Sequence, residues 1–194
     1  MNLAHLVGNR CLYWSQISGR DNRVILAHGA RLFGYVEMRG EGNRVLLGEN
    51  AYFTGKILVK GKGLTLSIGA NTSMRNSYLL VQEGADLTIG ADCLFSREVE
   101  IRTSDAHSLV EAATGKRLNK SAAVLIGDHV WVGARSFISK GSVIPSHSVV
   151  GAMSFVNKRF ESEGVVLAGV PARVVREGIT WHRERRNRFP ALDS

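Results

Sequence analysis

A repeat of 21 residues runs through the first half of the chain and constrains the fold more than any other feature. Apolar or aromatic residues recur at this spacing in five columns, although only 44% of the chain is hydrophobic. Columns two residues apart share one face of an extended strand. The columns are Val24, Val45, Leu66, Leu87; Leu26, Leu47, Ile68, Ile89; Leu32, Phe53, Met74, Phe95; Val36, Ile57, Tyr78, Val99; and Met38, Val59, Leu80, Ile101.

A second rhythm, of six residues, governs the second half of the chain. A helix cannot hold positions six apart on one face, since six steps of 100° end far from the start, whereas short strands joined by tight corners can. The pattern predicts an all-β, three-sided parallel β-solenoid with coils of about 21 residues early and about 18 residues late. The three additional residues per early coil predict a less regular N-terminal half. The late positions are Ile126, Val132, Ile138, Ile144, Val150 and Val156.

Two segments depart from the repeat. Residues 1–176 form one predicted solenoid domain, and residues 105–123 form a polar loop that we expect to protrude, to close over an active site and to reach a neighbouring subunit. Residues 177–194 are a predicted C-terminal capping tail, amphipathic and helical, that buries Trp181 over the last coil. The tail is also basic from Trp181 to Arg188, which allows contact with an anionic polymer or membrane surface instead.

Composition narrows the class of protein. The formal net charge is +8, but outside the tail the basic residues are scattered, and no aromatic residues accompany a basic face, which disfavours a nucleic-acid partner. The two cysteines, Cys11 and Cys93, are far apart and read as reduced thiols of a cytoplasmic protein. The N-terminus has no signal-peptide pattern, and no apolar run is long enough to span a bilayer.

Three motifs carry a resemblance to a known family. "IGDHVWVG" (126–133), "AGVPARVVRE" (168–177) and "SDAHS" (104–108) resemble segments of the hexapeptide-repeat acyltransferases, in the branch of galactoside, maltose and polysaccharide O-acetyltransferases. The resemblance implies a left-handed parallel β-helix, against the general right-handed preference of crossovers. It also implies a homotrimer with active sites at the subunit boundaries and acetyl-CoA as co-substrate.

His107 is the predicted general base. Imidazole titrates near neutrality, and this residue lies outside the apolar columns at the start of the irregular loop, where the family places its catalytic histidine. Asp105, two residues earlier, either orients the imidazole, binds an acceptor hydroxyl or ends the strand. We interpret the other histidines as solvated and inert; they are His5, His28, His129, His147 and His182.

The resemblance also implies the donor site. A main-chain amide near Gly133 or Ala134 would stabilise the oxyanion, and Trp131 would pack against the pantetheine arm, unless its indole merely covers the solenoid surface. The small residues Gly151, Ala152 and Ala168 would lie beside the adenine. Lys158 and Arg173 are the expected phosphate contacts.

The sequence therefore predicts an acetyl-CoA-dependent O-acetyltransferase that modifies a sugar hydroxyl of a bacterial surface polysaccharide or its precursor, with no metal. An N-acetyltransferase acting on an amino-sugar nucleotide is the alternative enzyme. The alternative to an acetyltransferase is a non-enzymatic solenoid scaffold or a relative of the zinc-dependent carbonic anhydrase branch. The zinc enzyme needs three histidines, and His107 and His129, 22 residues apart, have no convincing third partner.

Overall fold

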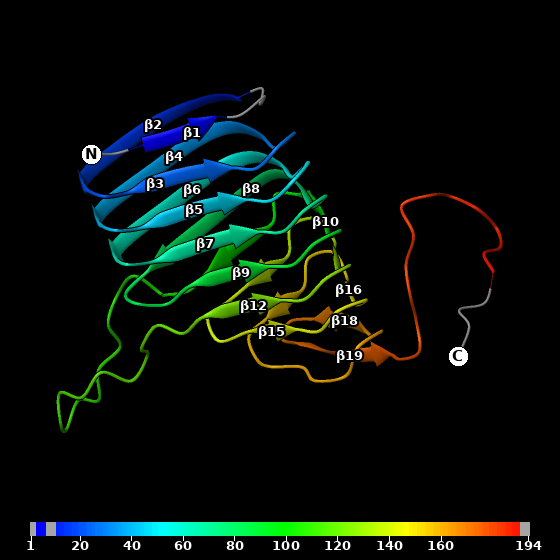
Figure 1. The fold of residues 1–194 in the computed structure, drawn as a ribbon. Coiled ribbons are helices and arrows are strands. Elements are labelled where there is room, and N and C mark those ends of the chain that lie inside the picture. The colour runs from blue at the N-terminus through cyan, green and yellow to red at the C-terminus, as the bar shows by residue number, and fades with distance from the viewer. Residues whose placement is uncertain (1–2, 7–10, 191–194) are drawn as a thin grey trace.

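The computed structural model describes residues 3–6 and 11–190, and it is a β-solenoid (Figure 1). One side is a seven-stranded parallel sheet in the order β1-β3-β5-β7-β9-β12-β15, one strand for each coil. The strands are β1 (Leu3–Leu6), β3 (Arg23–Leu26), β5 (Arg44–Leu47), β7 (Thr65–Ile68), β9 (Leu87–Ile89), β12 (Val124–Ile126) and β15 (Val143–Ile144).

A twelve-stranded sheet forms the other two sides. After β8 it divides into two rows, β10-β13-β16-β18 and β11-β14-β17, so the late coils are three-sided. Among the described strands, β19 alone pairs antiparallel, with β18. Its strands are β2 (Cys11–Arg20), β4 (Arg31–Glu41), β6 (Tyr52–Lys62), β8 (Ser73–Gln82), β10 (Leu94–Arg97), β11 (Glu100–Arg102), β13 (Trp131–Val132), β14 (Phe137–Ile138), β16 (Val149–Val150), β17 (Phe155–Val156), β18 (Val166–Gly169) and β19 (Ala172–Arg176).

The early coils are long because two sides share one continuous strand. β4 and β6 pair residue for residue at the 21-residue spacing, and each bends at a glycine with positive φ, Gly34 (129°) and Gly55 (135°). A Cβ on Gly34 would lie 2.0 Å from the carbonyl oxygen of Gly55, so only glycine fits this bend. The three additional residues thus lengthen a strand, and the expectation of a less regular N-terminal half is wrong.

The register confirms both repeat lengths. Leu125 pairs with Val143, 18 residues later, whereas Thr88 pairs with Leu125, 37 residues later. Removing the 19 residues of the predicted loop, 105–123, from 37 leaves 18. The loop is therefore an insertion into an otherwise regular coil, and it projects from the body of the solenoid, in green (Figure 1).

Two predicted columns slip by one residue in β8. Ile57 pairs with Leu79 and Val59 with Val81, because the register shifts after Phe53. The inserted residue lies near Asn76, whose φ is 47°. Leu79 and Val81 therefore take the places in the packed core that were predicted for Tyr78 and Leu80, although Leu80 is itself buried, and the remaining columns are buried as expected.

The C-terminal tail differs from the predicted cap. Residues 177–190 contain no helix, and the remainder of the predicted cap, 191–194, lies outside the described residues. Trp181 is buried as expected, with 6% of its surface exposed, but against the side of the solenoid. Its Nε1–H donates to the carbonyl of His129 (2.7 Å), whose imidazole stacks on the indole with centroids 4.5 Å apart. These contacts hold the tail extended along one corner of the coils.

Candidate functional site

The base of the inserted loop is held by Asp105. Its carboxylate accepts hydrogen bonds from Lys140 Nζ (2.5 Å) and Asn119 Nδ2 (2.7 Å), and the same amide of Asn119 also donates to the carbonyl of His107 (2.9 Å). The hydrogen bond from Lys140 holds the pKa of Asp105 below its ordinary value. Asp105 thus fixes the backbone of His107 through Asn119, and in the described residues no hydrogen bond joins it to the imidazole.

His107 is exposed and follows a left-handed residue. Ala106 has a φ of 63°, and its N–H donates to Ser104 Oγ (3.0 Å). A left-handed conformation is uncommon for a residue other than glycine, but twelve such residues adopt it in the described part of this chain, so at Ala106 it shapes the turn and does not by itself mark a site. Within the described part of the chain the imidazole of His107 has no hydrogen-bond partner. The turn therefore presents an uncommitted imidazole to solvent.

Beyond His107 the loop is a short antiparallel hairpin. Leu118 N–H donates to the carbonyl of Leu109 (2.8 Å), and Val110 bridges to Arg117. Arg117 also pairs with Glu83 at the solenoid corner (2.8 Å). Leu109, Val110 and Leu118 are exposed by 61%, 51% and 55%. The hairpin is therefore anchored at its base, and it carries apolar side chains that no part of the described chain covers.

Small residues bring two coils together at another corner, which we call the alanine corner (Gly133, Ala134, Gly151 and Ala152). The N–H groups of Gly133 and Gly151 donate to the carbonyls of Val150 (2.7 Å) and Leu167 (2.8 Å). Among the described residues the N–H groups of Ala134 and Ala152 have no acceptor. Ala134, and not Gly133, thus has the free amide that an oxyanion needs.

The remaining predicted donor contacts divide between two corners. Ala168 packs beside Gly151, where a Cβ on the glycine would lie 3.1 Å from that of Ala168, and it pairs with Arg173 across β18 and β19. Lys158, in contrast, follows β17 at the corner that carries Lys140 and the inserted loop. The structure thus brings Arg173 to the alanine corner and leaves Lys158 and His107 at a different corner of the same coils.

Trp131 lies beside the tail. Its indole is 41% exposed on the outer surface of β13, with its ring centroid 6.2 Å from that of Trp181. The two rings line a cleft of about 230 Å³ between the coils and the tail, together with Leu94 and residues His182 to Arg185. The outward orientation expected for Trp131 is confirmed, with part of its surface facing this cleft.

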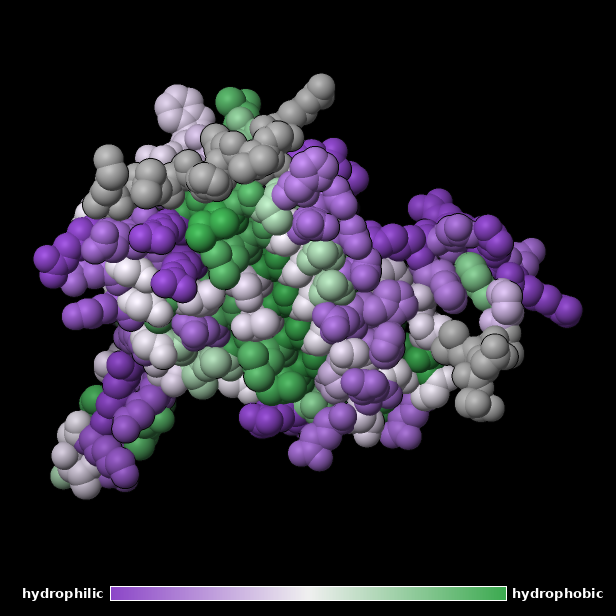
Figure 2. All heavy atoms as spheres, in the orientation of Figure 1, coloured by the Kyte–Doolittle hydropathy of each residue, from purple (hydrophilic) through white to green (hydrophobic). Residues whose placement is uncertain are grey.

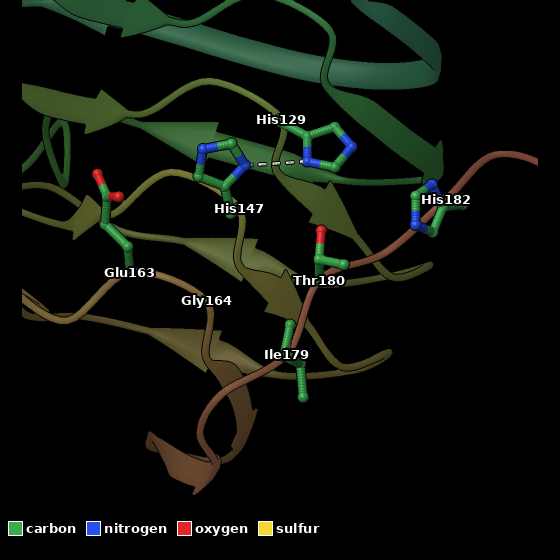
Figure 3. Close-up of a pocket in the computed structure, with 7 residues that line it drawn as sticks. All are labelled: His129, His147, Glu163, Gly164, Ile179, Thr180 and His182. Carbon is green, nitrogen blue, oxygen red and sulfur yellow. Dashed lines mark hydrogen bonds between the residues drawn. The ribbon is translucent and has the colours of Figure 1, made fainter. Parts of the chain in front are cut away.

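Two histidines expected to be inert form a pair where the tail docks. His129 and His147, from successive coils, face each other with their Nδ1 atoms 3.2 Å apart (Figure 3). Burial, and then the neighbouring His147, lower the pKa of His129. With Glu163, Gly164, Ile179, Thr180 and His182 they line a pocket of about 450 Å³. The two histidines are 18 residues apart, which equals the late repeat, and this spacing was the signal in the sequence that they lie on neighbouring coils.

No group of three or more His, Cys, Asp or Glu side chains in the described residues could hold a metal ion. Nor does that part of the chain contain a helix long and apolar enough to cross a membrane. Asn119 and Ala106, which position His107, had no signal in the sequence.

No family model matches this chain. A curated relative, a polysialic acid O-acetyltransferase of Neisseria meningitidis, is 40% identical over 93 residues. The match covers 48% of this chain and 43% of the relative, so the matched segment spans less than half of that protein's length.

Two solved structures resemble the whole solenoid. The polysialic-acid-specific acetyltransferase NeuO superimposes with a TM-score of 0.72 at 28% identity, covering 91% of this chain and 79% of that one. The polysialic acid O-acetyltransferase OatWY superimposes with a TM-score of 0.68 at 28% identity, covering 91% of this chain and 93% of that one. These matches confirm the left-handed β-helix expected from the motifs. The solenoid and these relatives agree with the resemblance of the motifs to the hexapeptide-repeat acyltransferases.

Proposed function

We propose that this chain is an acetyl-CoA-dependent O-acetyltransferase that modifies a hydroxyl group of an acidic bacterial surface polysaccharide. The observation that carries the proposal is the anchored turn at Ala106, which presents the exposed imidazole of His107 at the start of the inserted loop. The relatives named above, which act on polysialic acid, support the substrate class. Reduced thiols and a supply of acetyl-CoA are consistent with a cytoplasmic location.

The reaction is direct acyl transfer. His107 removes the proton of the acceptor hydroxyl as its oxygen attacks the thioester carbonyl, and the resulting oxyanion is stabilised by the free N–H of Ala134. When the C–S bond breaks, the imidazolium returns that proton to the departing thiolate of CoA. The products are an acetyl ester and CoA–SH, and no metal or redox step enters. Asp105 is a positioning residue, because it acts on His107 through Asn119.

The donor would lie along the alanine corner. Ala134 and Ala152 have free amides for the pantetheine carbonyls, Trp131 supplies an apolar surface for the arm, and Arg173 is close to Ala168 for a phosphate contact. Gly133 and Gly151 contribute by their size, since a Cβ on Gly133 would lie 2.4 Å from the nitrogen of Ala152. Lys158 would contact the donor bound to a neighbouring copy.

A second copy of the chain completes this site. His107 and the alanine corner lie at different corners of one solenoid, so a donor bound at the alanine corner needs the loop of another protomer. The exposed Leu109, Val110 and Leu118 on the hairpin provide apolar surface for that contact. An apolar stripe down the seven-stranded sheet, with Ile25 and Leu125 exposed by 37% and 44%, offers a further surface for association (Figure 2). In a closed ring of three copies, the inserted loop of each copy reaches the alanine corner of a neighbour.

The proposal is tested with purified protein, acetyl-CoA and polysialic acid. Release of free CoA thiol that depends on the polysaccharide, together with an acetyl product cleaved by neutral hydroxylamine, is the expected result, because hydroxylamine cleaves esters and leaves amides intact. A hydroxylamine-resistant product would establish N-acetylation instead. Absence of thiol release with every acidic polysaccharide offered, from protein that binds acetyl-CoA, would overturn the assignment.

A further inference from the structure

Only a few groups of the C-terminal tail anchor it to the solenoid. Ile179 N–H donates to the carbonyl of Gly164 (2.9 Å), and the guanidinium of Arg183 donates to the carbonyls of Asn71 (3.1 Å) and Cys93 (2.9 Å). With Trp181 on His129, these contacts run from the last coil back toward earlier ones. Figure 3 shows the tail between Ile179 and His182 passing beside Gly164 and His129. The tail is thus fixed beside Trp131 by the backbone of Ile179 and the side chains of Trp181 and Arg183, and its other cations are not needed to hold it.

Those other cations face solvent. Residues 182–188 carry four arginines and one glutamate, a formal charge of +3 with His182 neutral. Glu184 is taken by Arg186 at 2.6 Å. Arg185 and Arg188 are exposed, and neither has an ion pair within the described part of the chain. Of these two guanidinium groups, that of Arg185 lines the cleft beside Trp131, and Arg188 follows three residues later on the same exposed tail.

We propose that this tail is the docking element for the acidic polysaccharide, holding the acceptor chain beside the donor site. The inference rests on the proposed function and adds to it the residues that recognise the polymer. A polysaccharide with one carboxylate on each sugar matches a planar guanidinium, which binds a carboxylate through two parallel hydrogen bonds. Successive carboxylates let the polymer engage Arg185 and Arg188 together.

The position of the tail favours the acceptor over other anions. An anionic membrane would need a broad basic surface, whereas the free charge here is confined to one strip beside an aromatic cleft of about 230 Å³. Figure 2 shows hydrophilic side chains gathered over this strip at the right of the molecule, apart from the apolar stripe on the seven-stranded sheet. The tail therefore extends the binding surface without occupying the face that carries the apolar stripe.

The test is the double variant Arg185→Gln/Arg188→Gln. A matched control, Arg23→Gln/Arg44→Gln, removes two exposed arginines that pair side by side on β3 and β5 of the other sheet. For the tail variant we expect the KM for polysialic acid to rise about tenfold with kcat retained, and the dependence of KM on salt to weaken. The rise should be much smaller with a dimer of the same sugar, which is too short to span both arginines.

Several outcomes would overturn the inference. These are an unchanged KM in the tail variant, an equal rise in the control, or a weakened Kd for acetyl-CoA, which would assign the tail to the donor. Binding to phosphatidylglycerol vesicles that exceeds binding to polysialic acid would assign it to a membrane. Direct calorimetric titration with polysialic acid separates this inference from the proposed function. If wild-type protein and the control bind the polymer without transferring acetyl groups, and the tail variant does not bind, the docking role stands and the enzymatic proposal fails.

Discussion

Replacement of Trp181 by alanine should release the tail from the solenoid. The side chain is 6% exposed, stacks on His129 and donates a hydrogen bond of 2.7 Å to its carbonyl. Truncation of a buried tryptophan costs about 3–5 kcal/mol, and we take the lower value because the tail lies at the surface. About 3 kcal/mol raises the population with an undocked tail roughly a hundredfold.

Limited trypsin digestion measures this population, since Arg183, Arg185, Arg186 and Arg188 are cleavage sites within the tail. When opening is fast relative to cleavage, the rate of cutting follows the open fraction. We therefore expect the rate of cleavage in the tail of Trp181→Ala to rise roughly a hundredfold, and that of Trp181→Phe, which keeps most of the apolar contact, to rise about fivefold, for the loss of about 1 kcal/mol of hydrogen bonding. Trp14→Ala, at an 81% exposed position, is the control. Rates within twofold of wild type for both Trp181 variants would refute the docking geometry.

Two further predictions concern the same fold. Tail protection should weaken as the pH falls below about 6.5, because burial and then His147 lower the pKa of His129 in the docked state, with His182 and Arg183 acting in the same direction and Asp92 opposing them. The rate of cleavage in the tail by a protease active from pH 5 to 8 measures this loss of protection. A cleavage rate that does not change with pH would contradict the prediction. Asn43→Ala should lower the free energy of unfolding by about 3 kcal/mol, because three hydrogen bonds of a buried side chain are lost. The side-chain amide of Asn43 donates to Asn22 Oδ1 and to the carbonyl of Gly61, and it accepts from the N–H of Leu64. Urea denaturation measures this loss, with Asn157→Ala at an exposed position as the control. Equal midpoints for the two variants would count against a stabilising role for the buried hydrogen bonds of Asn43.

The fold could be predicted because stacked coils impose one spacing on every column. The slip at β8 was hidden because Tyr78 and Leu80 are themselves apolar, so the sequence fits either register until the backbone bulge near Asn76 is seen. A second shift follows Phe95, so Ile101 pairs with Leu79 and not with the predicted Leu80. The tail was mispredicted for a different reason. Its docking depends on the ring and carbonyl of His129, 52 residues earlier, and no local pattern reports so distant a contact.

The site was partly predictable by the same arithmetic. Ala134 and Ala152 are 18 residues apart and share a corner, as do Lys140 and Lys158, so the separation of Lys158 from the alanine corner was already implicit in the late repeat. The network of Asp105, Asn119 and Lys140 was not, because Asn119 belongs to the loop, which has no period. Which amide is free at the alanine corner likewise depends on hydrogen bonds that only the stacked coils define.

The most direct test of the account is the turnover of His107→Ala. The variant removes an exposed imidazole with no hydrogen-bond partner among the described residues, so folding, self-association and the Kd for acetyl-CoA should remain as in wild type. His28→Ala, which removes another exposed histidine, is the matched control and should keep full activity. With polysialic acid as acceptor, kcat of His107→Ala should fall by about a hundredfold or more. A kcat within twofold of the control would contradict the assignment of His107 as the base.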